Sequence, residues 1–248
     1  MKKKLGQNFL VDKRVAKREV GYACIDEDET VLEIGPGGGI LTELLLSKAS
    51  RVIAIERDEW LYERLFDRFR RFIPDRLELV RGDVLKVDFP PFDKVVSNIP
   101  YSISTPLTFK ILKLKFKKGV MMYQWEYARR MVASVGDREY SRLSVGVYYH
   151  AHASILERVP ASVFRPVPKV DSAIVEIRPR EPPFKVDEDK FFWLTNKLFQ
   201  HRRKMIKNIL DEELGVKEME ERRGDQLSPE EIAQLANRLG KGGDDISA

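Results

Sequence analysis

The sequence is poor in cysteine and histidine, with one Cys (Cys24) and three His in 248 residues. A single cysteine excludes an intramolecular disulfide and any zinc site built from several thiolates, so we expect no metal site and a reducing, cytoplasmic location. Long apolar runs are also absent: none approaches the ~18 residues that cross a bilayer, and the basic start from Met1 to Lys4 is not followed by the apolar stretch of ~7 or more residues that a signal peptide needs. We therefore expect neither membrane association nor export.

The excess of positive charge is small, with 44 Lys and Arg against 39 Asp and Glu, a net charge of +5. The distribution is more informative than the total, because basic residues concentrate at the N-terminus and again near residue 200. Clusters of this kind suit a polyanionic partner, although a solvated helix face is the alternative for each. The basic residues that we expect to contact such a partner are Lys3, Lys4, Arg202, Arg203, Lys204 and Lys207.

Short apolar runs rich in β-branched residues predict seven strands. They span Thr30 to Ile34, Arg51 to Ile55, Leu77 to Val80, Lys94 to Ser97, Gly119 to Tyr123, Leu143 to His150 and Val170 to Ile177. Helix-like stretches lie between the first five, at Ile40 to Leu46, Asp58 to Phe72 and Pro106 to Leu114. This alternation favours right-handed crossovers and a mostly parallel sheet of the α/β class, with the last two runs as an antiparallel pair at one edge.

The amino-acid composition changes after Ile177. Arg178 to Pro183 is rich in proline and is typical of a linker, and Phe191 to Leu210 has apolar residues near helical spacing. We therefore predict two domains, residues 1–180 with the sheet and residues 181–248 as a small helical domain.

Three predicted strands each end in a residue suited to an adenosine-containing cofactor. Glycines, among them Gly35 and Gly37, follow the first strand and let the backbone approach a ligand closely. Glu56 closes the second strand, where a carboxylate can accept hydrogen bonds from both ribose hydroxyls, and Asp83 follows the third and can accept from an adenine amino group. Each residue alone is compatible with an ordinary turn or cap, but their joint occurrence at successive strand ends indicates a cofactor site.

The fourth strand is followed by Asn98-Ile99-Pro100-Tyr101. An adenine amino group is a poor nucleophile because its lone pair is delocalised into the ring, so a catalyst needs acceptors that draw the nitrogen toward tetrahedral geometry. The Asn98 side-chain oxygen and the Ile99 carbonyl can accept its hydrogens, Pro100 stiffens the turn, and Tyr101 offers a ring for an extruded base. We expect these four residues to be catalytic.

These motifs resemble the small-subunit rRNA adenine N6,N6-dimethyltransferases of the KsgA type, over nearly the whole chain. The matching segments are Gly6-Gln7-Asn8-Phe9-Leu10, Glu33-Ile34-Gly35-Pro36-Gly37, Asn98-Ile99-Pro100-Tyr101, Phe164 to Ser172 and Gln200-His201-Arg202-Arg203-Lys204. The resemblance implies a Rossmann-like class I methyltransferase sheet of seven strands, mostly parallel with an antiparallel edge strand, plus a small α-helical C-terminal domain.

By the same resemblance, S-adenosyl-L-methionine is the cofactor, contacted by Asn8, Leu10, Gly35, Glu56, Asp83 and Asn98. The implied substrate is a pair of adjacent adenines in the loop of the 3′-terminal helix of small-subunit rRNA, within a small-subunit precursor, each methylated twice during ribosome biogenesis. We expect a monomer. The sequence departs from the family at Trp125, where lysine is common, and at Ser141, where glycine is common.

The sequence alone leaves three other functions open. A large-subunit rRNA adenine methylase of the antibiotic-resistance type has a similar Asn-hydrophobic-Pro-Tyr motif, and a ribosome-assembly or transcription factor would keep the fold and bind RNA without catalysis. A nicotinamide dehydrogenase is disfavoured because Ile40 breaks the G-x-G-x-x-G spacing.

Overall fold

The computed structural model describes residues 8–217 and 220–239. Within these ranges the chain forms two compact units. Unit 1 comprises the described residues up to Ala128 together with His152–Pro179, and unit 2 comprises Arg129–Ala151 together with the described residues from Arg180 onward. The helical tail therefore shares its unit with an earlier stretch of the chain, and each unit has its own fold.

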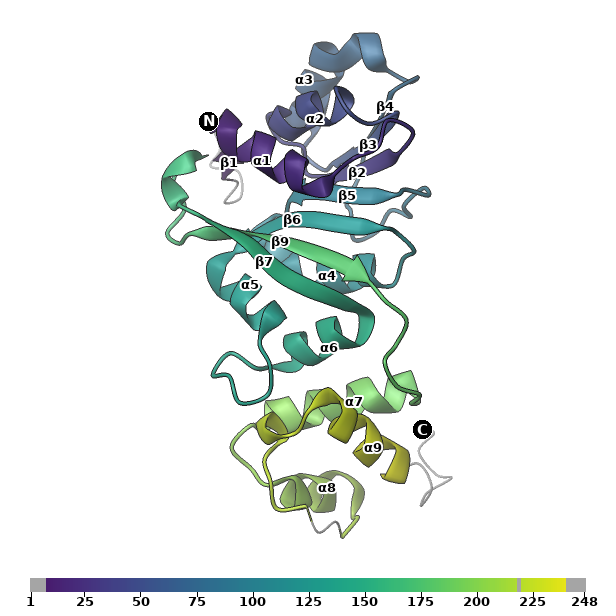
Figure 1. Cartoon of the computed structure of the whole chain (residues 1–248), viewed down its shortest axis with the longest axis vertical. Helices are drawn as coiled ribbons and strands as arrows, with labels where there is room; N and C mark the ends of the chain where they lie inside the picture. The colour runs from purple at the N-terminus through teal and green to yellow at the C-terminus, as the bar shows by residue number, and fades with distance from the viewer. Residues whose placement is uncertain (1–7, 218–219, 240–248) are drawn as a thin grey trace. The chain divides into compact units, whose positions relative to one another are not determined.

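Unit 1 is built on a seven-stranded sheet of order β4-β3-β2-β5-β6-β9-β7 (Figure 1). The strands are β2 (Thr30–Ile34), β3 (Arg51–Glu56), β4 (Leu77–Arg81), β5 (Lys94–Asn98), β6 (Lys118–Gln124), β7 (Ala151–Val159) and β9 (Ser172–Pro179). β4, β3, β2, β5 and β6 pair in parallel, whereas β9 runs antiparallel to β6. The predicted Rossmann-like sheet is confirmed, with β2 and β5 adjacent although two strands separate them in sequence.

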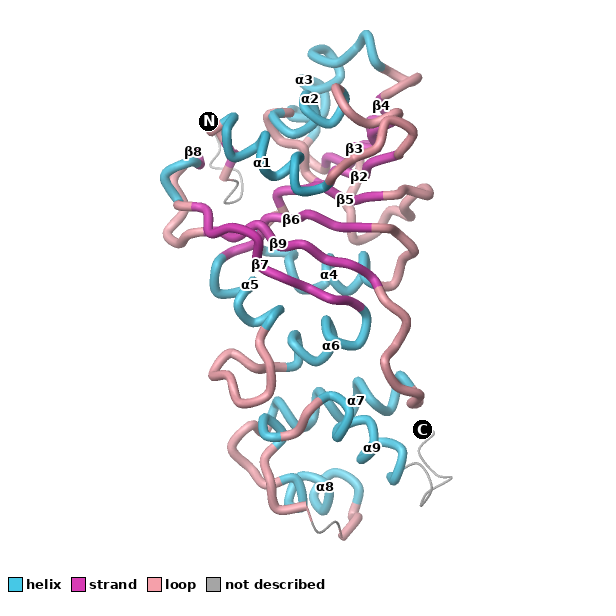
Figure 2. The backbone as a smooth tube through the Cα atoms, viewed as in Figure 1, coloured by secondary structure: helices cyan, strands magenta, loops and turns pink. Residues whose placement is uncertain are grey.

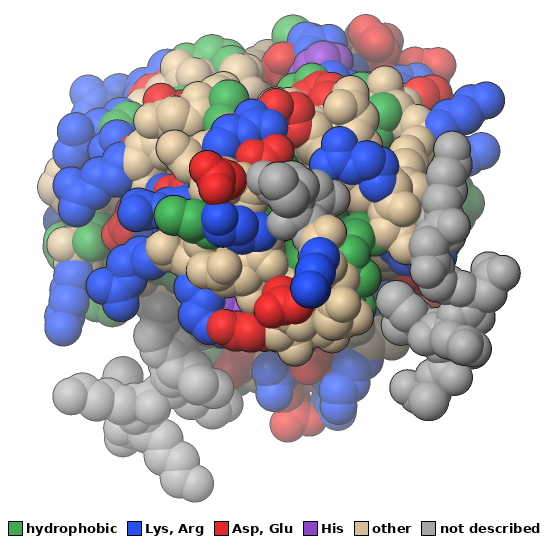
Figure 3. Space-filling view, turned by 90° about the horizontal axis from the view of Figure 1, so that it is seen from below, with side chains coloured by type: hydrophobic (Ala, Val, Ile, Leu, Met, Phe, Trp, Pro, Cys, Tyr) green, Lys and Arg blue, Asp and Glu red, His purple; other side chains and the backbone are tan. Residues whose placement is uncertain are grey.

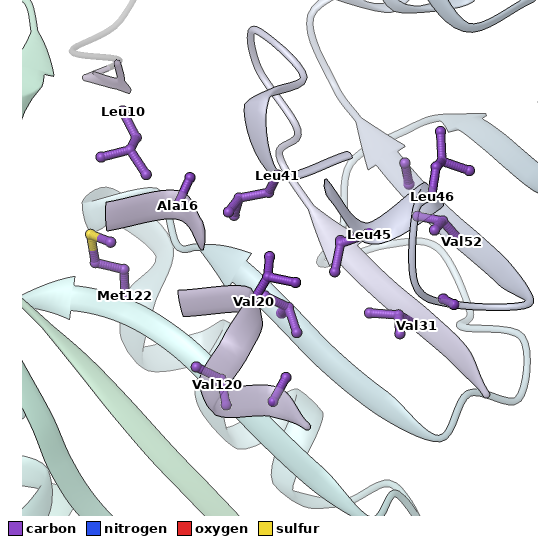
Figure 4. Packing of buried hydrophobic residues seen from close by; sticks show 14 of the residues in the cluster. Leu10, Ala16, Val20, Val31, Leu41, Leu45, Leu46, Val52, Val120 and Met122 are labelled. Carbon is purple, nitrogen blue, oxygen red and sulfur yellow. The ribbon is translucent and has the colours of Figure 1, made fainter. Parts of the chain in front are cut away.

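Helices of unit 1 pack on this sheet (Figure 2). They are α1 (Lys13–Ala23), α2 (Ile40–Leu46), α3 (Glu59–Phe69) and α4 (Ser104–Leu112), and α5 (Trp125–Val132) begins in unit 1. α1 begins where the Asp12 carboxylate accepts a hydrogen bond from Arg14 N at 2.8 Å, and it ends at Cys24, whose φ is +49°. Its side chains Ala16 and Val20 meet those of Leu41 and Leu45 of α2 above the strands (Figure 4).

Apolar side chains at the centre of this core are completely buried: Val31, Leu45 and Val120 are each 0% exposed. Burial of one such side chain contributes roughly 1.5–3 kcal/mol relative to leaving it in water. Because the central strands β2, β3, β5 and β6 are buried on both faces, their sequences are near-continuous apolar runs, which is why they could be found from the sequence. The sheet therefore holds the residues at the carboxyl ends of its strands in fixed positions.

Unit 2 is helical. Its helices are α6 (Arg142–His150), α7 (Glu188–Gln200), α8 (Ile206–Leu214) and α9 (Pro229–Leu239). Their buried faces share a second apolar cluster that includes Tyr140, Phe191 and Leu210. Asp187 caps α7 by accepting from Lys190 N at 3.0 Å, and Gly215, with φ +63°, ends α8.

Three sequence predictions of local structure are wrong. Residues 143–150, predicted as a strand, form α6, because Leu143 to Val147 pack on nearly all sides within unit 2 and this burial outweighs the strand preference of valine and tyrosine. The edge strand is β7 instead. The helical spacing predicted over Phe191 to Leu210 is interrupted at residues 201–205, between α7 and α8, and Arg178 and Pro179 continue β9 rather than starting the linker.

Among the described residues, no helix is long and apolar enough to cross a membrane. Over the same ranges, no three Asp, Glu, His or Cys side chains are grouped as metal ligands would be.

Candidate active site

The candidate site lies at the carboxyl ends of the parallel strands, where the loop between β2 and α2 is built on glycine. Gly35, Gly37 and Gly39 all have positive φ, at 64°, 55° and 76°. L-residues with side chains rarely adopt this region, so glycine is required for the loop to turn from the strand into α2. Gly35 N donates to Ile55 O at 2.9 Å, which fixes the loop against the end of β3.

Glu56, the last residue of β3, lies beside this loop and is only 4% exposed. Its Oε2 accepts from Gly37 N at 3.2 Å and its Oε1 accepts from Asp58 N at 2.8 Å. Burial raises the pKa of the carboxyl, while these backbone donors oppose that shift. Each oxygen retains a further lone pair, so an oriented carboxylate is available for two hydroxyl donors such as those of a ribose.

Asp83 follows β4 and is held close to Glu56 by the backbone. Gly82 N donates to Glu56 O at 2.9 Å, and Asp83 Oδ1 accepts from Leu85 N at 3.0 Å. The other carboxylate oxygen lies 3.6 Å from the exposed Arg57 guanidinium, an ion pair that solvent weakens. Asp83 Oδ2 can therefore exchange this contact for an amino group.

Asn98 ends β5 beside the glycine loop, and its Oδ1 is buried without a hydrogen-bond partner. The neighbouring Ser97 hydroxyl donates to Ile34 O at 2.6 Å and joins the ends of β5 and β2. A Cβ placed on Gly35 would lie 3.6 Å from the Pro100 side chain, so the glycine loop and Asn98-Ile99-Pro100-Tyr101 are in contact. A buried acceptor without a donor costs roughly 1–3 kcal/mol, and the Asn98 oxygen is thus prepared for a donor from a ligand.

Tyr101 begins a short 3₁₀ turn, Tyr101–Ile103, and is held by a residue 71 positions away. Its hydroxyl lies 2.7 Å from Ser172 Oγ, and Ser172 at the start of β9 is fully buried. Burial raises the pKa of the Tyr101 phenol, so the side chain is neutral and the hydroxyl can take part in this bond as donor or acceptor. The bond fixes the orientation of the ring. Sequence reasoning assigned Ser172 no such role, because no spacing rule connects residues so far apart.

The N-terminal segment covers the glycine loop. β1 (Phe9–Leu10) pairs antiparallel with β8 (Phe164–Arg165), and a Cβ on Gly37 would come within 2.9 Å of the Phe9 ring. Leu10 is buried in the core of unit 1, and Asn8 is partly exposed. Phe9 belongs to a motif that resembles the family's, but the sequence assigned it no contact, and glycine at position 37 is what allows the ring to approach.

Two buried carboxyls lie in the same unit. Glu33 of β2 accepts from the Thr42 hydroxyl at 2.7 Å, and burial raises its pKa to about 8. Glu19 of α1 is 0% exposed, neither of its carboxyl oxygens has a hydrogen-bond partner, and burial and the nearby Glu33 raise its pKa well above the usual range. The raised pKa favours the protonated form of each carboxyl, which makes both poor cation ligands.

The basic residues predicted to bind a polyanion are divided. Lys3 and Lys4 lie outside the described residues. Arg202, Arg203, Lys204 and Lys207, hereafter the basic tail cluster, lie in unit 2, where three of them form ion pairs: Arg202 with Asp225 at 2.9 Å, Lys204 with Glu212 at 2.7 Å and Lys207 with Glu221 at 2.8 Å. Figure 3, which views the chain from below, shows basic and acidic side chains interspersed near its centre. Such exposed pairs are weak and can be exchanged for phosphate.

A family model described as "Ribosomal RNA adenine dimethylase" matches residues 1–238. Among curated proteins, the chain is 45% identical over 248 residues to the "Probable ribosomal RNA small subunit methyltransferase A" of Methanosarcina acetivorans, covering 94% of this chain and 91% of the relative. It is 47% identical over 208 residues to the protein of the same name from Thermococcus sibiricus, covering 83% of this chain and 74% of that one.

Two solved structures resemble the chain along most of its length. A dimethyladenosine transferase from Plasmodium falciparum matches with a TM-score of 0.83 and 31% identity, covering 94% of this chain and 98% of that one. The 23S rRNA methyltransferase ErmE matches with a TM-score of 0.72 and 29% identity, covering 94% and 100%.

Proposed function

The chain belongs to the ribosomal RNA adenine dimethylase family, and on that premise we propose that it transfers methyl groups from S-adenosyl-L-methionine to N6 of adenines in small-subunit rRNA. The match to the family model and the curated relatives confirms the resemblance seen in its motifs, and the chain is an rRNA adenine dimethyltransferase. The observation that carries the proposal of mechanism is the buried Asn98 Oδ1 without a partner, adjacent to the glycine loop.

The residues at the strand ends fit the cofactor. Glu56 would accept from the ribose hydroxyls, Asp83 from the adenine amino group, and the backbone at Gly35 and Gly37 would let the cofactor lie close to the sheet. Asn8, Leu10 and Asn98 complete the proposed set, with Asn8 and Leu10 on the segment that covers the loop. When bound, the cofactor supplies an electrophilic methyl group on a sulfonium.

Asn98 and Ile99 would activate the nucleophile. Asn98 Oδ1 accepts one N6 hydrogen and the Ile99 carbonyl accepts the other, which draws the lone pair out of the ring and toward the methyl donor. Pro100 keeps the turn rigid. The methylated nitrogen is acidic and releases a proton to water, so no base needs to be positioned beforehand.

The same two acceptors explain why transfer can occur twice and then stop. Unmodified adenine has two N6 hydrogens, the monomethylated base has one and the dimethylated base has none. After the second transfer both acceptors lose their donor, and a buried carbonyl without a donor disfavours binding by roughly 1–3 kcal/mol. Release of the dimethylated base is the consequence.

Tyr101 would hold the target base. A base must leave its stack in the RNA to reach Asn98, which costs free energy. Stacking on an aromatic ring offsets this cost by on the order of 1–3 kcal/mol per base. The bond to Ser172 fixes the Tyr101 ring before the base arrives, which reduces the ordering cost.

We propose a small-subunit precursor as substrate, with two adjacent adenines in the loop of its 3′-terminal helix as targets and a role in ribosome biogenesis. The names of the relatives from Methanosarcina and Thermococcus support the subunit. Residues 1–180 would carry the chemistry as a monomer, while residues 181–248, through the basic tail cluster, and Lys3 and Lys4 would contact rRNA phosphates. The likeness to a 23S rRNA methyltransferase supports a second candidate, large-subunit rRNA.

The test is transfer of labelled methyl groups from S-adenosyl-L-methionine to purified small and large subunits that lack the modification, followed by mapping of the product. We expect dimethyladenosine at two adjacent loop adenines of the small subunit and none with Asn98→Ala. Label on large subunits alone would favour the second candidate. Binding to small subunits without transfer would leave an assembly factor, and normal assembly of subunits with Asn98→Ala in vivo would separate any assembly role from the chemistry.

A further inference from the structure

An open hollow of about 820 Å³ lies on unit 1 between the start of α1 and the segment around the 3₁₀ turn Ala161–Val163. Lys13, Arg14 and Arg18 line one wall, and Pro160, Ser162 and Arg165 line the other. We call this hollow the basic groove. None of these residues belongs to the cofactor or base sites described above.

Backbone contacts hold the two walls of the basic groove together. Val11 N donates to Val163 O at 2.9 Å, and directly before it β1 pairs with β8, Leu10 with Phe164 and Phe9 with Arg165. Asp12, between β1 and α1, caps the helix. The groove is therefore a formed feature of the sheet region and not a gap between loose side chains.

The charge of the basic groove is strongly positive. Lys13, Arg14 and Arg18 of α1 line the groove, and the exposed Lys17 lies outside the lining, one turn beyond Lys13 on the same helix face. Arg14 pairs with Asp12 and Arg18 pairs with Glu157.

The remaining cations have no acidic partner within the described residues. They are the exposed lysines Lys13 and Lys17, and Arg165, whose guanidinium donates only to the backbone carbonyls of Ser162 and Phe164. Four basic side chains and one acidic side chain, Asp12, line the groove, and Lys17 adds a further positive charge beside it, an excess that suits an anionic polymer.

The strand pair β1–β8, which adjoins the basic groove, is connected to both halves of the active site. Phe9 of β1 rests against Gly37 of the glycine loop. On the other side, β8 leads through residues 166–171 to Ser172, which is bonded to Tyr101. An RNA strand that places a base on Tyr101 extends over the neighbouring surface on either side of that base. The surface beside the strand pair β1–β8 carries the cations that have no acidic partner among the described residues.

We propose that the basic groove binds the sugar–phosphate backbone of the RNA next to the target adenine, with Lys13, Lys17 and Arg165 as phosphate contacts. This inference rests on the proposed function and assigns it a second RNA contact, within unit 1. Contacts of this kind supply affinity that depends on salt and reads no sequence.

The test compares Lys13→Glu/Lys17→Glu with Lys113→Glu/Lys115→Glu in the full-length protein. Both pairs are exposed lysines of unit 1 and make the same change in net charge. Affinity for unmodified small subunits is measured at several salt concentrations, and S-adenosylhomocysteine affinity is measured by calorimetry. We expect the groove variant to lose tenfold or more in RNA affinity and its salt slope to fall by about 1.4, for two lost phosphate contacts at roughly 0.7 each on a single strand, whereas the control should lose far less.

Unchanged cofactor affinity shows that the groove variant is folded. Equal losses in the two variants, or no loss in either, would overturn the proposal. The outcome is independent of catalysis, because binding is measured without transfer: if the wild-type chain bound subunits but transferred no methyl group, the proposed function would fail and the groove could still stand.

A hydroxyl-radical source attached to Ser162→Cys in a Cys24→Ser background gives a second measurement that does not depend on charge reversal. We expect cleavage of the rRNA within a few nucleotides of the methylated adenines, and little from the same probe at Lys113→Cys. Cleavage confined to distant rRNA, or equal cleavage from both probes, would contradict the proposal. An acidic peptide that occupied the groove without weakening RNA binding would contradict it as well.

Discussion

The strand ends of unit 1 and the basic tail cluster of unit 2 differ in how their polar groups are satisfied. At the strand ends, Glu56 is buried and oriented by backbone donors, and Asn98 Oδ1 is buried with no donor. In the tail, three of four cations are neutralised by nearby acids and accessible to water. The difference teaches that a reactive site is recognised by what folding leaves unsatisfied, whereas a run of like charge in a sequence can be neutralised by residues further along the chain.

The largest expected effect is on the strand ends. Asn98→Ala removes the acceptor for the N6 hydrogen, and loss of one oriented group that stabilises a transition state lowers kcat by about 10²–10³-fold. Single-turnover methyl transfer with saturating RNA and cofactor measures it. A loss confined to KM for RNA would mean that Asn98 holds the substrate without activating it, and the contrast between the two regions would disappear.

The tail is tested by Arg203→Glu with Lys204→Glu. We expect RNA affinity to fall by about tenfold, with a smaller salt slope and unchanged kcat and cofactor affinity, because phosphate contacts position the RNA and take no part in transfer. Lys185→Glu with Lys190→Glu is the matched control, since both lysines are exposed in unit 2. If the control weakens binding equally, the cluster has no specific role.

Buried carboxyls also lower the stability of unit 1, and Glu19 of α1 shows this through the dependence of stability on pH. Its raised folded-state pKa means that the folded state keeps a proton that the unfolded state loses above about pH 4.5, so stability falls as pH rises from there toward the folded pKa.

Glu19→Met should therefore increase the free energy of unfolding by about 1–3 kcal/mol at pH 7, and by less at pH 4. Urea unfolding at the two pH values measures the gain. A gain that does not grow with pH would show that the Glu19 carboxyl is ionised in the folded protein.

The bond between Tyr101 and Ser172 should contribute about 1 kcal/mol, or roughly a fivefold change in kcat/KM. Ser172→Ala and Tyr101→Phe each break it while keeping the ring. The double variant should be no worse than either single one, since a bond can be lost only once. Additive losses in this cycle would assign the two side chains separate roles.

The smallest expected effect concerns the ion pair of Lys204 in the basic tail cluster, and it tests whether that pairing limits RNA binding. Glu212→Gln removes the acid that pairs with Lys204 at 2.7 Å and frees the ammonium for a phosphate. We expect RNA affinity to rise by about two- to fivefold at low salt, in line with roughly 0.2–1 kcal/mol for an exposed pair. Unchanged affinity would mean that Lys204 faces no phosphate.

The sequence predicted the strand ends well because their signals are local. Buried strands are continuous apolar runs, and the glycines at 35 and 37 stand where only glycine turns easily. It failed where tertiary contacts decide. Residues 143–150 have strand-type side chains, yet burial within unit 2 makes them a helix. α1 was missed because its buried face includes Glu19, which interrupts the apolar pattern, and the ion pairs of the tail depend on acids 8–23 residues further along the chain.

The discontinuous make-up of unit 2 limits how the molecule can be dissected. Residues 129–151 belong to it but precede the last strands of unit 1, so the chain passes between the units three times. Truncation at residue 180 would not release an autonomous catalytic fragment, because it would strip α6 of α7 and α9 and expose Val145 and Tyr149, which are 0% and 4% exposed in the intact chain. For gene fusion or domain exchange, unit 2 must be transplanted as two segments.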